Sequence, residues 1–229
     1  MFGTADPHRF RKTVAGICMI GAPALFLLGS VISPSLDSDE GTLLANASAH
    51  ADRWLISGLL VFAGFVLLIV ALLGFMHMLR ERGVAFGHLG GGLAIVGCLA
   101  GVATGALDLV IWQMGAAGAD QGQMASLLER VTGTAGSAIP LLLLGFCTTL
   151  GFLVLCWGLF SERMAPAWET GTLAVGAVMF AVASLAYSAP LFIVASAFTL
   201  VGLGAIGRTV LTESVEDWEH APGIGAAAA

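Results

Sequence analysis

Asp108 is the one carboxylate inside the long apolar runs of this 229-residue chain. A carboxylate at membrane depth usually has a partner or a role, such as binding a proton, a cation or a polar ligand. Arg53 and His50 precede the second apolar run and are its candidate partners, and Trp112 follows Asp108 by one helical turn. We therefore predict an outward-facing ligand site at Asp108, His50, Arg53 and Trp112. A structural ion pair or a hydrogen-bonded acid is the alternative.

A glycine face lies in the same apolar run. Gly97, Gly101 and Gly105 form two overlapping GxxxG motifs, and Asp108 comes three residues after the last of them. Small residues at this spacing let a neighbouring backbone approach a membrane helix closely. The motif predicts tight helix packing on this face. It leaves open whether the neighbour belongs to the same chain, to a second copy or to a membrane partner.

Other residue types give little sign of catalysis or of a cofactor. His77 and His88 flank a short turn, and an axial pair of histidines is enough to hold haem, although histidines also rest comfortably at a membrane interface. The sequence has no HExxH motif, P-loop, CxxCH or CxxC pair. It also lacks a basic tract with interleaved aromatic residues, so nucleic-acid binding has no support. We expect no cofactor, and we favour a function without catalysis.

Six apolar runs must position these residues. Only 10% of the residues are charged, the mean hydropathy is +0.94, and each run is long enough to cross the hydrocarbon core. The sequence predicts a single all-α membrane domain over 1–229, a polytopic bundle with a flexible tail from 212 to 229. The expected spans cover about 13–33, 54–78, 89–114, 137–160, 170–187 and 190–208.

The basic residues indicate an orientation. Cytoplasmic loops of membrane proteins are enriched in lysine and arginine. With the N-terminus inside, the inner segments hold Arg9, Arg11, Lys12, Arg80, Arg82, Arg163 and Arg208, and the outer ones hold Arg53 and Arg130. We therefore expect a bacterial cytoplasmic membrane with both termini inside and the two long connections outside. The second connection carries Met124, Leu127, Leu128 and Val131 at helical spacing, which predicts a short amphipathic helix.

Two inner turns resemble each other. Glu81-Arg82 and Glu162-Arg163 are each followed by an aromatic residue, a glycine and an apolar run that reaches a further glycine. This pattern suggests that the second and third runs are repeated in the fourth and fifth. The alternative is that short cytoplasmic turns converge on the same residue types.

The order of features resembles uncharacterised six-helix integral membrane proteins of high-GC bacteria. These features are the basic N-terminus, an acidic loop with a histidine, the Arg80-Glu81-Arg82-Gly83 turn and the glycine-rich third run. The resemblance implies the membrane fold, and it implies no activity and no functional residues. We predict binding of a small apolar or amphipathic ligand, or of a membrane partner, in a cavity open to the outside. A small-solute or proton-coupled transporter, and a haem- or metal-binding membrane protein, are the alternatives.

Overall fold

The computed structural model describes residues 6–34, 40–115 and 120–220, and the regular structure in these residues is helical throughout. Six of the helices are long and apolar enough to cross a membrane. They are α1 (Pro7–Ile32), α3 (Ala51–Met78), α4 (Val84–Met114), α6 (Ala135–Ser161), α7 (Ala167–Ala186) and α8 (Ala189–Thr212). The prediction of an all-α bundle with six candidate spans is confirmed.

Several of these helices begin before the apolar runs that predicted them, and in α1 a polar residue caps the extra turn. The Asp6 carboxylate accepts a hydrogen bond of 3.1 Å from the backbone N–H of His8, and Pro7 occupies the first turn of α1. Proline suits this position because the first-turn N–H groups have no partner within the helix. Hydropathy alone detects the apolar part of a helix and misses such a turn.

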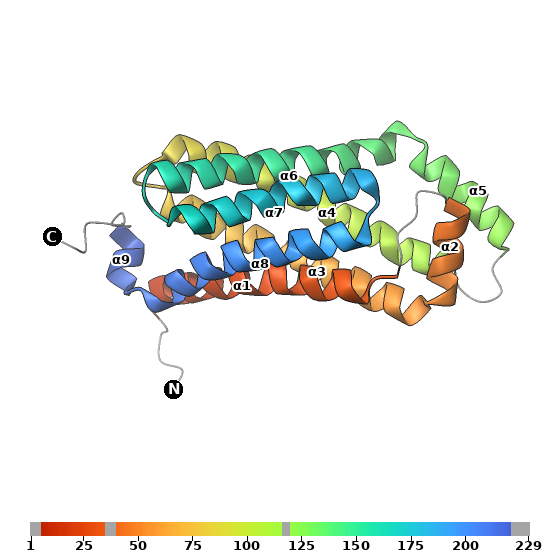
Figure 1. Cartoon of the computed structure of the whole chain (residues 1–229), viewed down its shortest axis with the longest axis horizontal. Helices are drawn as coiled ribbons and strands as arrows, with labels where there is room; N and C mark the ends of the chain where they lie inside the picture. The colour runs from red at the N-terminus through yellow and green to blue at the C-terminus, as the bar shows by residue number, and fades with distance from the viewer. Residues whose placement is uncertain (1–5, 35–39, 116–119, 221–229) are drawn as a thin grey trace.

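The six long helices form a closed ring in which each packs against the next along the chain, and α8 packs back against α1 (Figure 1). Alternating up-and-down helices bring the start of α1 and the end of α8 to the same end of the bundle. Two short helices, α2 (Glu40–Ala49) and α5 (Gln121–Thr132), lie at the opposite end. The ring therefore has one end that carries the termini and one end that carries α2 and α5.

A ninth helix, α9 (Val215–His220), packs at the end of the bundle that carries the termini. The sequence predicted a flexible tail from 212 to 229, whereas residues 215–220 form α9. Burial of the apolar Trp218 side chain, which is only 3% exposed, holds this short helix against the bundle. Residues 221–229 lie outside the described residues.

The glycine face of α4 is buried within the chain. A Cβ atom at Gly97 would collide with Thr148 of α6, and one at Gly101 would lie 2.6 Å from the Phe65 ring of α3. At Gly105 it would lie 3.3 Å from Phe62 Cβ. The three glycines thus let α4 pack closely against two neighbours of the same chain. Contact with a second copy through this face would require α3 or α6 to move away.

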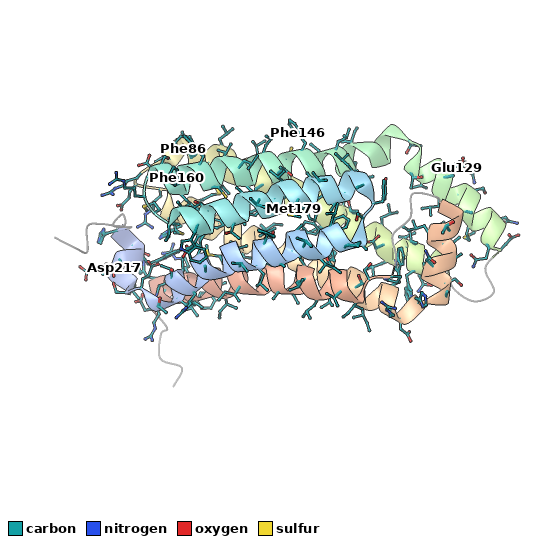
Figure 2. The ribbon with its side chains drawn as sticks, in the orientation of Figure 1. Phe86, Glu129, Phe146, Phe160, Met179 and Asp217 are labelled. Carbon is teal, nitrogen blue, oxygen red and sulfur yellow. The ribbon has the colours of Figure 1, made fainter. Side chains whose placement is uncertain are left out.

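Large apolar side chains on the outside of the bundle are exposed. Phe146 on α6 is 67% exposed and Leu185 on α7 is 84% exposed, and Figure 2 shows Phe146 pointing away from the bundle. A large apolar surface of this kind fits a lipid environment. The fold therefore supports contact with a lipid bilayer, as the sequence predicted.

Candidate functional site

Asp108 lies on the face of α4 that packs against α3. A Cβ atom at Gly58 would lie 3.6 Å from the Asp108 Cβ, which is an ordinary van der Waals distance, so the aspartate faces Gly58 of α3 directly. The indole N–H of Trp54, one turn earlier on α3, donates a hydrogen bond of 3.1 Å to the backbone carbonyl of Asp108. Among the described residues, the carboxylate itself has no hydrogen-bond or ion-pair partner, and the side chain is partly buried.

Arg53 and His50 do not meet Asp108. The Arg53 Nε donates a hydrogen bond of 3.1 Å to the carbonyl of Ile32, which is the last residue of α1. A cation at this position satisfies a carbonyl group that the end of the helix leaves open. His50 is exposed and occupies the N-cap position of α3 without a capping hydrogen bond from its side chain. Their part in a ligand site stays a prediction.

Trp112 belongs to a second apolar cluster, separate from the main core. The buried members of this cluster come from α2, α5 and the adjoining ends of α3 and α4, and they are Leu44, Ala47, Trp54, Ile111, Met114 and Leu128. Trp112 packs against them and is partly buried. The cluster joins α2 and α5 into a cap over the end of α3 and α4, which we call the α2–α5 cap.

An open groove of about 580 Å³ runs between the two helices of the α2–α5 cap. The described part of its walls is built mostly from small side chains and includes no charged residue. It consists of Gly41, Leu44, Ala45, Ser48 and Ala49 from α2, and of Gln121, Gly122 and Ala125 from α5. Sites for small molecules commonly have volumes of roughly 300–1,000 Å³ and mainly apolar walls with a few polar groups. The volume of the groove lies in this range, and most of its lining residues are exposed, so the groove is open to its surroundings.

The cap arises because each of its helices has a large and a small face. Leu44 and Leu128 are each 1% exposed and hold α2 and α5 together on the inner side. Gly41, Ala45 and Ala49 recur at every fourth residue of α2, so they share one face of that helix. Small residues on this face leave the space between the helices unfilled on its outer side. The groove therefore follows from the pattern of side-chain sizes.

The groove was not predicted from the sequence, because residues 34–53 lack a long apolar run and were expected to form a connection. The fourfold spacing of Gly41, Ala45 and Ala49 was the available signal, and it indicates a helix with one small face. The amphipathic helix expected in the second connection is present as α5. Its Leu128 is buried in the cap, whereas Leu127 and Val131 are each 40% exposed.

The two histidines considered for haem have other contacts. The His77 ring stacks on Trp218 with a centroid distance of 4.7 Å, and both of its nitrogens contact Arg80. The His88 Nδ1 lies 2.9 Å from the Val84 carbonyl of its own helix. The described residues contain no group of three or more histidine, cysteine or acidic side chains placed to hold a metal ion.

The fold and the cap define a multi-pass α-helical membrane protein with a groove at one end. Comparison of the chain with protein-family models, with curated proteins and with solved structures finds no match.

Proposed function

We propose that this chain is a non-enzymatic membrane protein that binds the acyl chain of one amphipathic molecule in the groove of the α2–α5 cap. The observation that carries the proposal is a groove of about 580 Å³ beside a bundle with apolar outer surfaces. We place the groove, at the end of the bundle, near the level where lipid chains and headgroups meet. A single acyl chain is the most abundant apolar ligand at that depth.

The residues that line the groove suit a ligand that has an acyl chain and a polar end. Alanine and glycine on both helices offer carbon surface without bulk, which suits an extended hydrocarbon chain. Ser48 and Gln121 supply a hydroxyl and an amide at the walls. These two groups can hydrogen-bond a carboxyl, ester or hydroxyl group of the ligand. The described residues that line the groove carry no charge, and we propose that the groove selects for the chain and not for the headgroup charge.

We further propose that the protein resides in a bacterial cytoplasmic membrane with both termini inside, among six-helix membrane proteins of high-GC bacteria. Seven basic residues in the inner segments against two in the outer ones support this orientation. The groove then faces outward. It lies in the α2–α5 cap and not at the cluster of Asp108, His50 and Arg53 that the sequence analysis favoured.

The test is photo-crosslinking with a diazirine-labelled C16 fatty acid on the full-length protein in lipid nanodiscs. We expect crosslinks on α2 and α5 that fall about tenfold or more in Ala45→Trp, equivalent to at least 1.4 kcal/mol of lost affinity. The indole fills the groove and needs no change in the core. Ser126→Trp is the matched control, because Ser126 is an exposed residue of α5 that does not line the groove.

Crosslinks at Phe146 on α6 report ordinary contact with the surrounding lipid and serve as the internal reference. Equal crosslinking of the cap in wild type and Ala45→Trp, at the level seen around Phe146, would contradict the proposal.

A further inference from the structure

At the end of the bundle that carries the termini, basic side chains from two helices converge on one carboxylate. Among the described residues, the Oε1 of Glu219 in α9 lies 2.8 Å from the Nδ1 of His8 on α1 and 3.9 Å from the Nε2 of His77 on α3. Its Oε2 lies 3.5 Å from the guanidinium of Arg80, which follows the end of α3. The ends of α1 and α3 thus supply the basic groups, and α9 supplies the anion.

Two arginines give this group of side chains a charge that does not depend on histidine. A guanidinium nitrogen of Arg11 lies 3.5 Å from the Nδ1 of His8, and Arg80 also contacts the His77 ring. Arginine stays protonated at any physiological pH. The exposed Glu81 lies 3.8 Å from Arg80 and offsets part of its charge. We call His8, Arg11, His77 and Arg80 the basic cluster.

A short helix brings Glu219 to the basic cluster. The six residues of α9 are too few for a helix that is stable alone, because isolated helices below about 12 residues are marginal in water. Trp218 is buried against the His77 ring, but its indole N–H has no hydrogen-bond partner among the described residues, which costs free energy. The ion pairs of Glu219 with His8 and Arg80 are partly exposed to solvent, so they add little stability. Another anion can therefore compete with Glu219.

The basic cluster lies where two candidate spans end. The helix α3 ends at Met78, two residues before Arg80. On α1, Phe10 lies between two arginines, and its side chain is 62% exposed. An exposed apolar ring at this position suits contact with lipid. With α1 and α3 as membrane spans, the basic cluster lies at the level of the lipid headgroups.

We propose that the basic cluster binds the phosphate group of an anionic phospholipid, and that Glu219 occupies the same position when no such lipid is bound. A phosphate offers more acceptor oxygens than a carboxylate and forms charge-assisted hydrogen bonds with arginine. Basic pockets between the ends of membrane helices bind anionic headgroups in this way. A zwitterionic lipid brings its own cation to the arginines and binds less tightly.

This lipid site is separate from the groove, because the two lie at opposite ends of the bundle (Figure 1). The groove is proposed to hold an acyl chain without regard to headgroup charge. The basic cluster instead recognises the charge of the headgroup. Either site can therefore fail its test without consequence for the other.

The test is photo-crosslinking with a phosphatidylglycerol that carries a diazirine in its headgroup. The full-length protein is placed in phosphatidylcholine nanodiscs with a low fraction of this probe. We expect crosslinks at the ends of α1 and α3 that carry the basic cluster. A phosphatidylcholine with the same diazirine should give a yield there about fivefold lower, the effect of one charge near a membrane surface. Crosslinks at the turn between α6 and α7, which holds Arg163, report general attraction at the same end.

Three substitutions separate a specific site from general attraction. Arg80→Gln removes a charged donor and should lower the yield about tenfold or more. Arg82→Gln is the matched control, because Arg82 is exposed in the same turn, and it should lower the yield by no more than about fivefold. Glu219→Gln removes the competing anion and should raise the yield about two- to fivefold, the effect of a partly exposed ion pair. A rise in one variant and a fall in another cannot both come from loss of folding.

Three results would overturn the proposal. They are equal yields with the two lipid probes, equal losses in Arg80→Gln and Arg82→Gln, and a yield in Glu219→Gln that does not rise. The source of the phosphate is tested with millimolar inorganic phosphate at constant ionic strength. We expect it to leave the crosslinks in place. Loss of the crosslinks would assign the basic cluster to a soluble phosphate and contradict the choice of a lipid.

Discussion

Asp108 illustrates how a single residue is accommodated inside a span. Its backbone carbonyl accepts a hydrogen bond from the Trp54 indole N–H, and its Cβ faces Gly58, but its carboxylate has no partner among the described residues. A charge in this setting costs free energy that no ion pair offsets. A side chain of this kind is retained either for a role in moving protons or solutes or because its cost is tolerable.

Replacing Asp108 with asparagine tests which of these applies. We expect Asp108→Asn to unfold at the same temperature or higher in detergent, because the change removes an ionisable group and keeps the shape. We also expect acyl-chain crosslinking in the cap to be unchanged, because Asp108 does not line the groove. Proton-coupled solute flux in proteoliposomes that disappears in Asp108→Asn would instead favour a transporter.

At the scale of elements, glycines set the distances between neighbouring helices. In two successive hairpins a glycine of the first helix faces a threonine of the second, and a glycine three residues later packs back on the first helix. The residues are Gly97, Thr148 and Gly151 in α4 and α6, and Gly176, Thr199 and Gly202 in α7 and α8. In this comparison α4 corresponds to α7. The two similar turns of the sequence, which precede α4 and α7, suggest the same correspondence.

Gly97→Leu should separate α4 from α6. Its side chain would collide with the backbone and the hydroxyl of Thr148, so we expect a loss of about 1–3 kcal/mol or more in the free energy of unfolding. The measurement is an unfolding titration with sodium dodecyl sulfate followed by circular dichroism. Gly92→Leu is the matched control on the same helix, because no heavy atom lies within 4 Å of a Cβ added there. Equal destabilisation by both substitutions would refute a specific role for the glycine face.

Considered as a whole, the molecule has two different ends, and a membrane must orient them. We expect a membrane-impermeant maleimide to label Asp52→Cys, at the start of α3, in intact bacterial cells. Glu216→Cys on α9 should be labelled only after the cells are opened. Both positions are exposed in the folded protein, so the labelling differs by membrane side alone. The reverse pattern would contradict the orientation that the arginine distribution predicts.

The sequence was informative where membrane physics restricts the chain. A span must satisfy its backbone hydrogen bonds internally, so long apolar runs become helices, and small residues such as Gly97 mark close packing. It was uninformative where structure depends on distant contacts. Arg80 and Glu219 are 139 positions apart, and nothing local to either residue indicates that they meet. The groove depends likewise on α2 lying beside α5, although the small residues of α2 were visible.

The measurement that tests the account most directly is native mass spectrometry of the protein extracted gently from its own membrane, with Ala45→Trp prepared in parallel. Wild type should carry one tightly held adduct with the mass of a lipid or fatty acid, which survives activation that strips the weakly bound surrounding lipid. Ala45→Trp should lack that adduct while retaining the same fold by circular dichroism. A wild-type protein without a retained adduct, or an adduct equally abundant in Ala45→Trp, would contradict binding in the α2–α5 cap.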